Sequence, residues 1–475
     1  MVNQPSPEHT LARLAVTGTF HGTFHAAAEE RLARARDLAD QVSPELVAKV
    51  AAYCREHRKE VDLPALLVAN LAARDVATMN RVFTRVVDDG ATLRSFVRIV
   101  RSGVTGRKSF GSAPKRALRA WFAARTPDVV FRHSIGQDPS MSDVIKMVRP
   151  PPRNDEGEAD AVREALYGYL IGKSVDSSAL PPLAKAFDAF KRGEGPVPDV
   201  PFEMLTALPL RAEHWTDLAT KMTASQLRVH LTTLARLGIL DAPELEAIVA
   251  TTLADAEGYR HGRVMPFDVL ASLRTADERV PASILSALAL GLEHATANVP
   301  RLDGRVVIAP DVSGSMRRSL GGARLRLLDV AALVTAVVLR RSTEAKVAPF
   351  ADDVLELDPP PTARDPVLAT LDRLGALPIG NTRCPLERLV PASFDLLVVV
   401  TDALIDLAQW DAIRAASPDA RLVVVDLRRF PRPFPYRPDV LHVAGFSDSV
   451  FDVLTPFVRG DLQADHLRAI ESVVL

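Results

Sequence analysis

The chain has 475 residues, of which 47% are hydrophobic, and its formal net charge is −1. That length exceeds one typical domain, so two or more domains are expected. The near-zero charge gives no global argument for nucleic acid or membrane as a partner. Two cysteines are too few for a disulfide framework or a cysteine zinc site, which suits a reducing compartment.

Membrane insertion and secretion are both disfavoured by the sequence. No apolar run approaches the roughly 20 residues that a membrane span requires. The first ten residues are polar and lack the apolar core of a signal peptide. We therefore expect a soluble, cytoplasmic protein without a membrane partner.

From about residue 10 to residue 299 the apolar residues recur at helical spacing, and strand-like alternation is scarce. Ser43-Pro44 and Thr223-Ala224 each place an N-cap before a good first-turn residue. Many short helices in succession, without a heptad, predict a stacked HEAT-like helical-repeat domain. The predicted helices are 29–41, 44–58, 63–73, 78–87, 91–100, 115–124, 160–171, 180–190, 201–205, 215–221, 224–237, 242–255 and 281–299.

Near residues 300–304 the pattern changes from helical to strand-like, which predicts domains at 1–300 and 301–475. The later half alternates strands and helices, as in a Rossmann-like, doubly wound α/β domain. Residues 457–475 are expected to return and pack on another part of the chain, the helical domain being one candidate. The predicted strands are 305–309, 345–350, 354–357, 394–401, 421–426 and 440–443, and the helices are 325–340, 367–374, 384–389, 407–416 and 449–457.

Five oxygen-bearing residues follow the ends of predicted strands or lie on the loops between elements. Asp311, Ser313 and Ser315 form an Asp-x-Ser-x-Ser motif directly after a short apolar run. Thr382 lies on a loop, and Asp402 ends a second apolar strand. Carboxylates and hydroxyls are hard donors that suit Mg²⁺ or Mn²⁺ rather than zinc or copper. The sequence therefore predicts a divalent-cation site, with Mg²⁺ favoured, at the carboxyl edge of the sheet. The alternative is a capped turn, since Ser and Asp after a strand often cap the next helix.

Charge is concentrated in the helical half. Residues 91–153 contain thirteen Lys and Arg residues but only three acidic ones, a local excess of ten positive charges. A concentrated basic surface is typical of phosphate-backbone binding. The loop from Arg101 to Gly111 adds hydroxyl and backbone donors, and Lys115, Arg116 and Arg119 lie three to four residues apart on the next helix.

A solvated cationic surface is the alternative interpretation of this stretch. Aromatic residues make up only 5% of the chain, so stacking of bases on rows of aromatics is not expected to dominate. Recognition through shape and backbone is then the expected mode of RNA binding.

The two halves together resemble the Ro autoantigen family, in which a TROVE helical-repeat domain precedes a von Willebrand factor A domain. Bacterial members exist, and the resemblance covers nearly the whole chain. The metal-site residues match the metal-ion-dependent adhesion site of von Willebrand factor A domains, while helical motifs point to Ro. Those motifs are Arg13-Leu14 with Gly18–Phe24, Thr105–Ser109, Pro114–Leu118, Ser142–Lys146 and Pro266–Leu270.

The resemblance implies a monomeric ring with a basic central hole and a basic outer surface. Small noncoding Y-like RNA would bind outside, and 3′ ends of misfolded RNA would enter the hole. Such a ribonucleoprotein would act in RNA quality control, with polynucleotide phosphorylase or another exoribonuclease as a possible protein partner. The implied RNA-binding residues are Arg101, Arg107, Lys108, Lys115, Arg116, Arg119 and Lys146.

Three residues depart from the family pattern. Met141 stands where vertebrate members have His, Arg383 where an Asp usually follows the metal-site Thr, and Pro310 removes a backbone donor before Asp311. Arg383 places a positive charge near the cation and would weaken its binding. We expect a non-catalytic RNA-binding protein. The alternative is a metal-dependent protein-binding scaffold that does not bind RNA.

Overall fold

The computed structural model describes residues 6–17, 28–106, 108–134, 138–154, 157–319, 324–428, 437–444, 446, 450–451, 454, 457–458 and 465–475. The chain divides into two compact units. Unit 1 comprises Met1–Val16, Ala26–His214 and Ala464–Leu475, and unit 2 comprises Thr17–His25 and Trp215–Gln463. Helices give way to strands near residue 300, as expected, but the compact units divide near residue 214.

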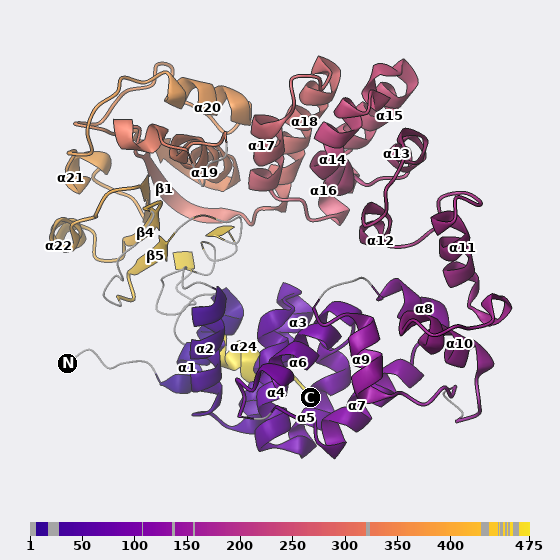
Figure 1. Ribbon diagram of the computed structural model, residues 1–475. Helices are drawn as coiled ribbons and strands as arrows, with labels where there is room; N and C mark the ends of the chain where they lie inside the picture. The colour runs from indigo at the N-terminus through magenta and orange to yellow at the C-terminus, as the bar shows by residue number, and fades with distance from the viewer. Residues whose placement is uncertain are drawn as a thin grey trace. The chain divides into compact units, whose positions relative to one another are not determined.

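Unit 1 is entirely helical in the part of it that the structure describes (Figure 1). Neighbouring helices pack in succession, with α3 against α4 and α5, and α4 against α6. Its helices are α1 (Pro7–Thr17), α2 (Ala28–Ala39), α3 (Pro44–Arg58), α4 (Asp62–Arg74), α5 (Val76–Val86), α6 (Gly90–Ser102), α7 (Ser112–Ala123), α8 (Pro127–Arg132), α9 (Met141–Val148), α10 (Ala161–Leu170), α11 (Pro182–Lys191), α12 (Phe202–Thr206) and α24 (Asp465–Glu471). Helix α13 (Ala212–Ala219) crosses the division.

The helix starts follow the capping residues. The Ser43 side chain accepts a hydrogen bond from the Leu46 amide, with Pro44 in the first turn. Ser140 and Asp143 form a reciprocal capping box at the start of α9. These side chains satisfy amide groups that have no partner inside the helix, so they fix where each helix begins.

The C-terminal segment packs on unit 1. Helix α24 contacts α3, and Ile470 is fully buried. The Lys49 ammonium donates a hydrogen bond of 2.6 Å to the Glu471 carbonyl. A return of this segment onto the helical region was one of the expectations from the sequence.

Unit 2 joins five helices to a parallel sheet. The helices are α14 (Ala224–Arg236), α15 (Pro243–Ala254), α16 (Ala256–His261), α17 (Pro266–Thr275) and α18 (Ala282–Ala295). The strands are β1 (Leu302–Pro310), β2 (Ser342–Val347), β3 (Leu396–Thr401), β4 (Arg421–Asp426) and β5 (Val440–Ala444). They pair in the order β2-β1-β3-β4-β5, and every pair is parallel.

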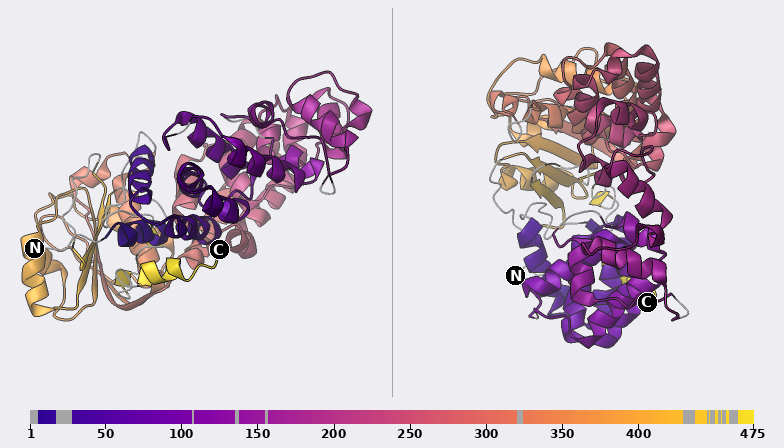
Figure 2. Two further views of the ribbon diagram at one scale, coloured as in Figure 1. Left: turned by 90° about the horizontal axis from the view of Figure 1, so that it is seen from below. Right: turned by 45° about the vertical axis from the view of Figure 1, so that its right-hand side comes forward.

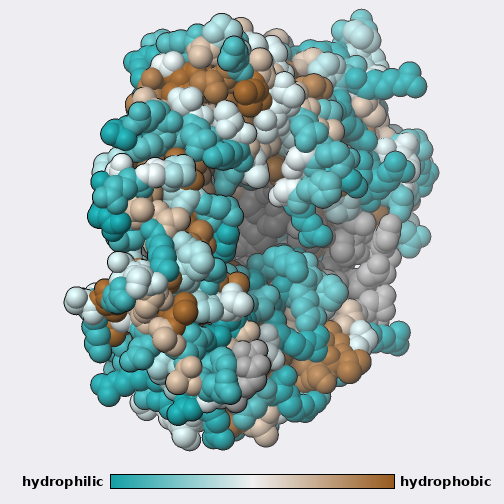
Figure 3. Space-filling model, turned by 90° about the vertical axis from the view of Figure 1, so that its right-hand side faces the viewer, coloured by the Kyte–Doolittle hydropathy of each residue, from teal (hydrophilic) through white to brown (hydrophobic). Residues whose placement is uncertain are grey.

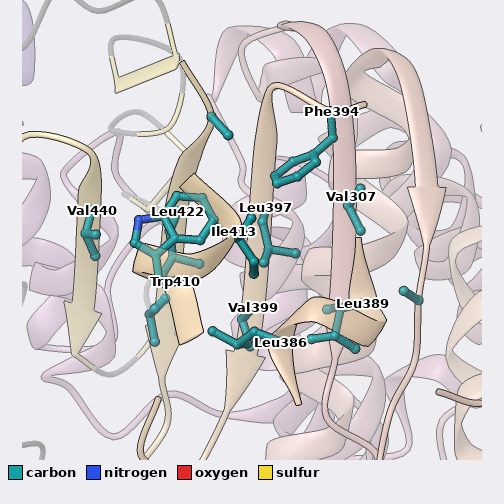
Figure 4. Close-up of a cluster of buried hydrophobic side chains, with 14 of the residues drawn as sticks. Val307, Leu386, Leu389, Phe394, Leu397, Val399, Trp410, Ile413, Leu422 and Val440 are labelled. Atoms are coloured by element: carbon teal, nitrogen blue, oxygen red, sulfur yellow. The ribbon is translucent and has the colours of Figure 1, made fainter. Parts of the chain in front are cut away.

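Helices cover both faces of the sheet (Figure 2). Helix α19 (Leu327–Arg341) packs on β1 and β2 and also contacts α20 (Val367–Gly375). Helices α21 (Leu386–Leu389) and α22 (Leu407–Ala416) cover the opposite face, where Trp410 and Leu386 pack on residues of the strands (Figure 4). Because both faces are buried, the central strands β3 and β4 are almost continuously apolar, whereas the edge strand β2 is polar and largely exposed. The predicted order of a helical region followed by a parallel α/β domain is confirmed.

The predicted strand at 354–357 is wrong. Val354 forms only an isolated antiparallel bridge with Phe350, and no strand follows it. Strand β2 ends at Val347, although the amides of Ala348 and Phe350 still donate to the Ile308 and Pro310 carbonyls of β1 at 2.8 and 3.1 Å. The predicted helix at 449–457 lies mostly outside the described residues.

Exposed large hydrophobic side chains are scattered rather than gathered. On the face shown in Figure 3, hydrophilic residues predominate and hydrophobic ones form small, separate patches. Scattered apolar residues of this kind are ordinary for a protein surface. No described helix is both long enough and apolar enough to cross a membrane.

Candidate metal centre and basic surface

The strand order brings the predicted metal ligands together. In the sheet, β2 lies on one side of β1, and β3, β4 and β5 lie in succession on the other side. The direction in which successive strands are added therefore reverses at β1. Loops diverge at such a point and leave room for a ligand at the carboxyl ends of the strands. Asp311 follows β1, and Asp402 follows β3, whose Val400 pairs with Pro310.

All five predicted ligands lie in one hydrogen-bonded group. Thr382 Oγ1 donates to Asp311 Oδ2 at 3.0 Å and lies 3.0 Å from Ser313 Oγ. Ser313 Oγ is 3.1 Å from Ser315 Oγ, which donates to Asp402 Oδ1 at 2.7 Å. Asp311 is fully buried, whereas Ser315 is exposed, so the group opens to solvent at one end.

The capped-turn alternative accounts for one contact, since Asp311 Oδ1 accepts from the Ser313 amide at 2.9 Å, but not for the contacts of the hydroxyls. The short 3₁₀ helix at Gly314–Arg317 has Ser313 at its N-cap, but no side chain caps it. Helix α19 begins only at Leu327. The hydroxyls instead face the two carboxylates. Two carboxylates and three hydroxyls within hydrogen-bonding distance fit a hard divalent cation, and Asp311, Ser313, Ser315, Thr382 and Asp402 are the residues that would hold it.

Two residues of this centre were not predicted from the sequence. Thr401 Oγ1 donates to Asp311 Oδ2 at 2.6 Å and so orients the buried carboxylate. Arg318 Nη2 lies 2.5 Å from Asp402 Oδ2 and forms an ion pair with it. Thr401 could have been predicted as part of this centre, because it is a polar residue at the end of an otherwise apolar strand. Nothing in the sequence indicated that Arg318 turns back to Asp402.

The expected effect of Arg383 is not supported by a contact with this centre. Its side chain is 75% exposed, and its nearest recorded carboxylate is that of Asp352, at 4.0 Å. The adjacent Cys384 is a poor nucleophile, because burial and the Asp353 carboxylate raise the pKa of its thiol to about 11.

A second charged group lies at the ends of β4 and β5. Asp426 accepts a 2.9 Å hydrogen bond from His442 and forms a close ion pair with Arg428, and the His442 and Asp426 side chains are each 1% exposed. Burial alone raises the pKa of Asp426, but the bonds from Arg428 and His442 outweigh it and lower the pKa to about 2. The Asp426 carboxylate is therefore a stable anion that holds the two strand ends together.

Several cations of the basic stretch are structural. Arg94 is 5% exposed and donates to the His133 carbonyl. Arg98 pairs with Asp62, and Arg132 with Asp199, at 2.7 Å each. Arg125 stacks over the Trp121 ring at 3.9 Å. Carboxylates from outside residues 91–153 therefore compensate part of the local charge excess.

Most of the predicted RNA-binding residues stay at the surface. Lys108, Arg116 and Lys146 are exposed, and Lys115 is half-buried on α7. Arg101 is exposed at the end of α6, with Nη1 2.8 Å from the Met147 sulfur. Arg107 and the Gly18–Phe24 motif lie outside the described residues.

Arg119 has a structural contact that the sequence did not reveal. Its Nε donates a 2.9 Å hydrogen bond to the Val148 carbonyl and so ties α7 to the last turn of α9. Met141, the first residue of α9, is 1% exposed and packs in the core rather than facing a ligand. Among the described residues, Lys108, Lys115, Arg116, Lys146 and Arg149 form no ion pair.

Comparisons with known proteins agree with this arrangement. Residues 305–458 match the model of the Ro60 vWA domain. The chain is similar to the RNA-binding protein RO60 of Deinococcus radiodurans, with 25% identity over 96% of this chain and 93% of that protein. It is also similar to the RNA-binding protein RO60 of Caenorhabditis elegans, with 26% identity over 52% of this chain and 41% of that protein. The crystal structure of the Deinococcus radiodurans RO (RSR) protein superposes with a TM-score of 0.75 at 23% identity, over 96% of this chain and all of the other.

Proposed function

We propose that this chain, which belongs to the Ro family and carries a Ro60-type vWA domain at residues 305–458, is an RNA-binding protein. The observation that carries the proposal is the group of five cations, Lys108, Lys115, Arg116, Lys146 and Arg149, that form no ion pair among the described residues. Surface cations without a carboxylate partner can neutralise phosphates without first breaking an ion pair. Both curated relatives are named RNA-binding proteins.

The finer proposal follows the resemblance. The RNA is a small structured noncoding RNA of the Y type, bound on the basic surface, and 3′ ends of misfolded RNA enter a central hole. The protein then acts in cytoplasmic RNA quality control, alone or as an adaptor for an exoribonuclease such as polynucleotide phosphorylase. Its role is binding rather than catalysis, and Mg²⁺ at the Asp311 centre would hold the surrounding loops in place.

The test is crosslinking and sequencing of RNA from cells that carry the tagged protein. We compare the wild type with Lys115→Glu/Arg116→Glu, which reverses two surface charges of α7. Arg119 is left unchanged, because its bond to the Val148 carbonyl supports α9. The control is Lys59→Glu/Lys185→Glu, two exposed lysines of unit 1 outside the basic stretch.

Enrichment of one small structured RNA by the wild type and the control, with loss in the α7 variant, is the expected result. If the wild type enriches no RNA, the RNA-binding proposal is wrong. If both variants retain the RNA, α7 is not the binding surface.

A second candidate function is metal-dependent protein binding. Two exposed apolar residues flank the oxygen-rich centre: Ile379, which is 67% exposed, and Leu404, which is 61% exposed. A partner segment with an acidic side chain among apolar ones would fit these features. Partner capture that requires Mg²⁺ or Mn²⁺, is lost in Asp311→Ala and persists after RNase treatment would favour this candidate.

A further inference from the structure

Two cavities lie on either side of helix α9 in unit 1. The first, of about 590 Å³, lies between the end of α6 and α9 and is lined by Arg101, Ser102 and Met147. The second, of about 690 Å³, lies between the end of α9 and α10 and is lined by Arg149 and Tyr167. Both volumes are typical of ligand sites rather than of packing defects.

Lys146 lines both cavities. It is exposed on α9 and forms no ion pair among the described residues, so its ammonium lies on the ridge between them. A single ligand that fills both cavities must pass this ammonium. Its connecting group is therefore favoured if it carries negative charge.

The cavity walls combine apolar surfaces with cations at the rim. Met147 and Pro139 contribute apolar surface to the first cavity, and Pro150 and Tyr167 to the second. Arg101 contributes a guanidinium to the first cavity, which Asp138 and Asp143 also line. Arg149 and Lys173 contribute cations to the second cavity, where Glu164 is the one acidic lining residue among those described, so cations outnumber carboxylates at the second cavity. Flat apolar groups linked through an anion would match this pattern on both sides of α9.

Arg149 is the C-cap of helix α9. Its φ of 50° lies in the left-handed region in which many helices end. Its amide donates to the Ile145 carbonyl at 2.8 Å, and the preceding carbonyl, of Val148, accepts from Arg119. These two contacts fix the end of α9, and the exposed Arg149 side chain lines the second cavity.

We propose that the two cavities accept two unstacked bases of one single-stranded RNA segment, with the phosphate between them on Lys146. This inference rests on the proposed RNA-binding function and assigns a base-binding role to a surface that was predicted to read only the backbone. Bases that are not paired can be splayed apart and buried separately, which a duplex does not allow. Arg149 and Lys173 would contact the flanking phosphate.

The experiment compares two oligomers of equal charge with the full-length protein. One is a twelve-residue oligouridylate, and the other is an abasic ribose–phosphate chain of the same length. Affinities are measured by fluorescence anisotropy at fixed salt. We expect the wild type to bind the oligouridylate at least roughly tenfold more tightly, because each buried base contributes to affinity independently of charge.

The variant Ser102→Trp/Ser174→Trp places an indole in each cavity without changing charge, since both serines are exposed and line the cavities. The expected result is an affinity ratio near one, with binding of the abasic chain unchanged as evidence of an intact fold. Thr206→Trp is the matched control. Thr206 is an exposed hydroxyl residue that bonds to the carbonyl three residues earlier, as Ser102 does, and it lines neither cavity.

Each outcome bears on one proposal. If the wild type binds neither oligomer, it does not bind single-stranded RNA and this inference fails, while the crosslinking experiment decides the proposed function separately. If the wild type binds both equally, or if the double variant keeps or exceeds the wild-type ratio, RNA binds but the cavities do not accept bases. A ratio that falls in the double variant and not in Thr206→Trp supports the inference.

Discussion

At the scale of single residues, the ion pair of Arg318 with Asp402 would oppose binding of a cation at the candidate metal centre. Both oxygens of Asp402 have partners, Oδ1 accepting from Ser315 and Oδ2 pairing with Arg318. A cation that uses Asp402 must compete with this guanidinium, which is 60% exposed. A partly exposed ion pair contributes up to about 1 kcal/mol.

Arg318→Ala is therefore expected to tighten Mg²⁺ or Mn²⁺ binding by roughly fivefold, measured by isothermal titration calorimetry. Arg383→Ala is the comparison, since in the described structure that guanidinium is more exposed and pairs with Asp352 rather than with any of the five residues. An equal gain in both variants would mean that only net charge matters. A wild type and an Arg318→Ala variant that both bind no cation would remove the metal site itself.

The lowered pKa of Asp426 makes the folding stability of the protein depend on pH. Its pKa is lowered to about 2 in the fold, against about 3.9 in an unfolded chain. A lowered acid pKa contributes stability that is present above the unfolded value and is lost as pH falls towards the folded value. Asp426→Asn should remove about 2 kcal/mol at neutral pH and flatten the stability curve between about pH 4.5 and 2.5, as followed by urea unfolding. A variant with the wild-type slope in that range would contradict this.

The proximity of the five candidate metal ligands was predictable, because each follows a recognisable strand or loop and the topology of parallel sheets is restricted. The contacts of Arg318 and Arg119 were not predictable, since a long side chain can reach partners that are distant in the sequence. Arg119 was predicted to face RNA from its spacing on the helix alone. Its bond to the Val148 carbonyl depends on where α9 ends in space, which spacing does not determine.

At the scale of elements, the C-terminal helix is the clearest case of long-range packing. Ile470 of α24 is fully buried, whereas Val474, four residues later, is 83% exposed. Ile470→Ala should destabilise unit 1 by about 2–5 kcal/mol, because it leaves a cavity against α3. Val474→Ala should change stability by less than about 0.5 kcal/mol. Chemical denaturation followed by circular dichroism distinguishes them, and similar values would mean that α24 does not dock.

Long periodic elements were predictable from local sequence, and short irregular ones were not. The buried strand Leu396–Thr401 is apolar except for its last residue, so the interior of a sheet is the environment that buries it. The segment at 354–357 has strand-like residues, but after Val354 it has no partner strand in the described structure. The β-propensity of a segment shows that it can adopt an extended conformation, but it forms a strand only where a neighbouring strand pairs with it.

At the scale of the whole molecule, RNA binding is expected to depend strongly on salt although the net charge is close to zero. The reason is that the unpaired surface cations that the structure describes are concentrated in one part of the chain. If about five exposed cations each neutralise one phosphate, the affinity for single-stranded RNA should fall roughly 100-fold between about 50 and 200 mM salt. Lys115→Glu/Arg116→Glu should reduce the slope of log affinity against log salt by at least about 1.4. Titrations at several salt concentrations measure both, and a flat dependence would exclude phosphate contacts as the main source of affinity.

The passage of the chain out of unit 1 at residue 214 and back at residue 464 has a consequence for synthesis on the ribosome. The surface of α3 that receives Ile470 emerges early, but α24 is made roughly 250 residues after the rest of unit 1. Because α24 begins about 400 residues after α3 ends, that apolar surface waits roughly 20–80 s for its covering helix at about 5–20 residues per second. During this interval the nascent chain is a natural client for chaperones, and a ribosome that stalls within unit 2 leaves unit 1 without its last helix.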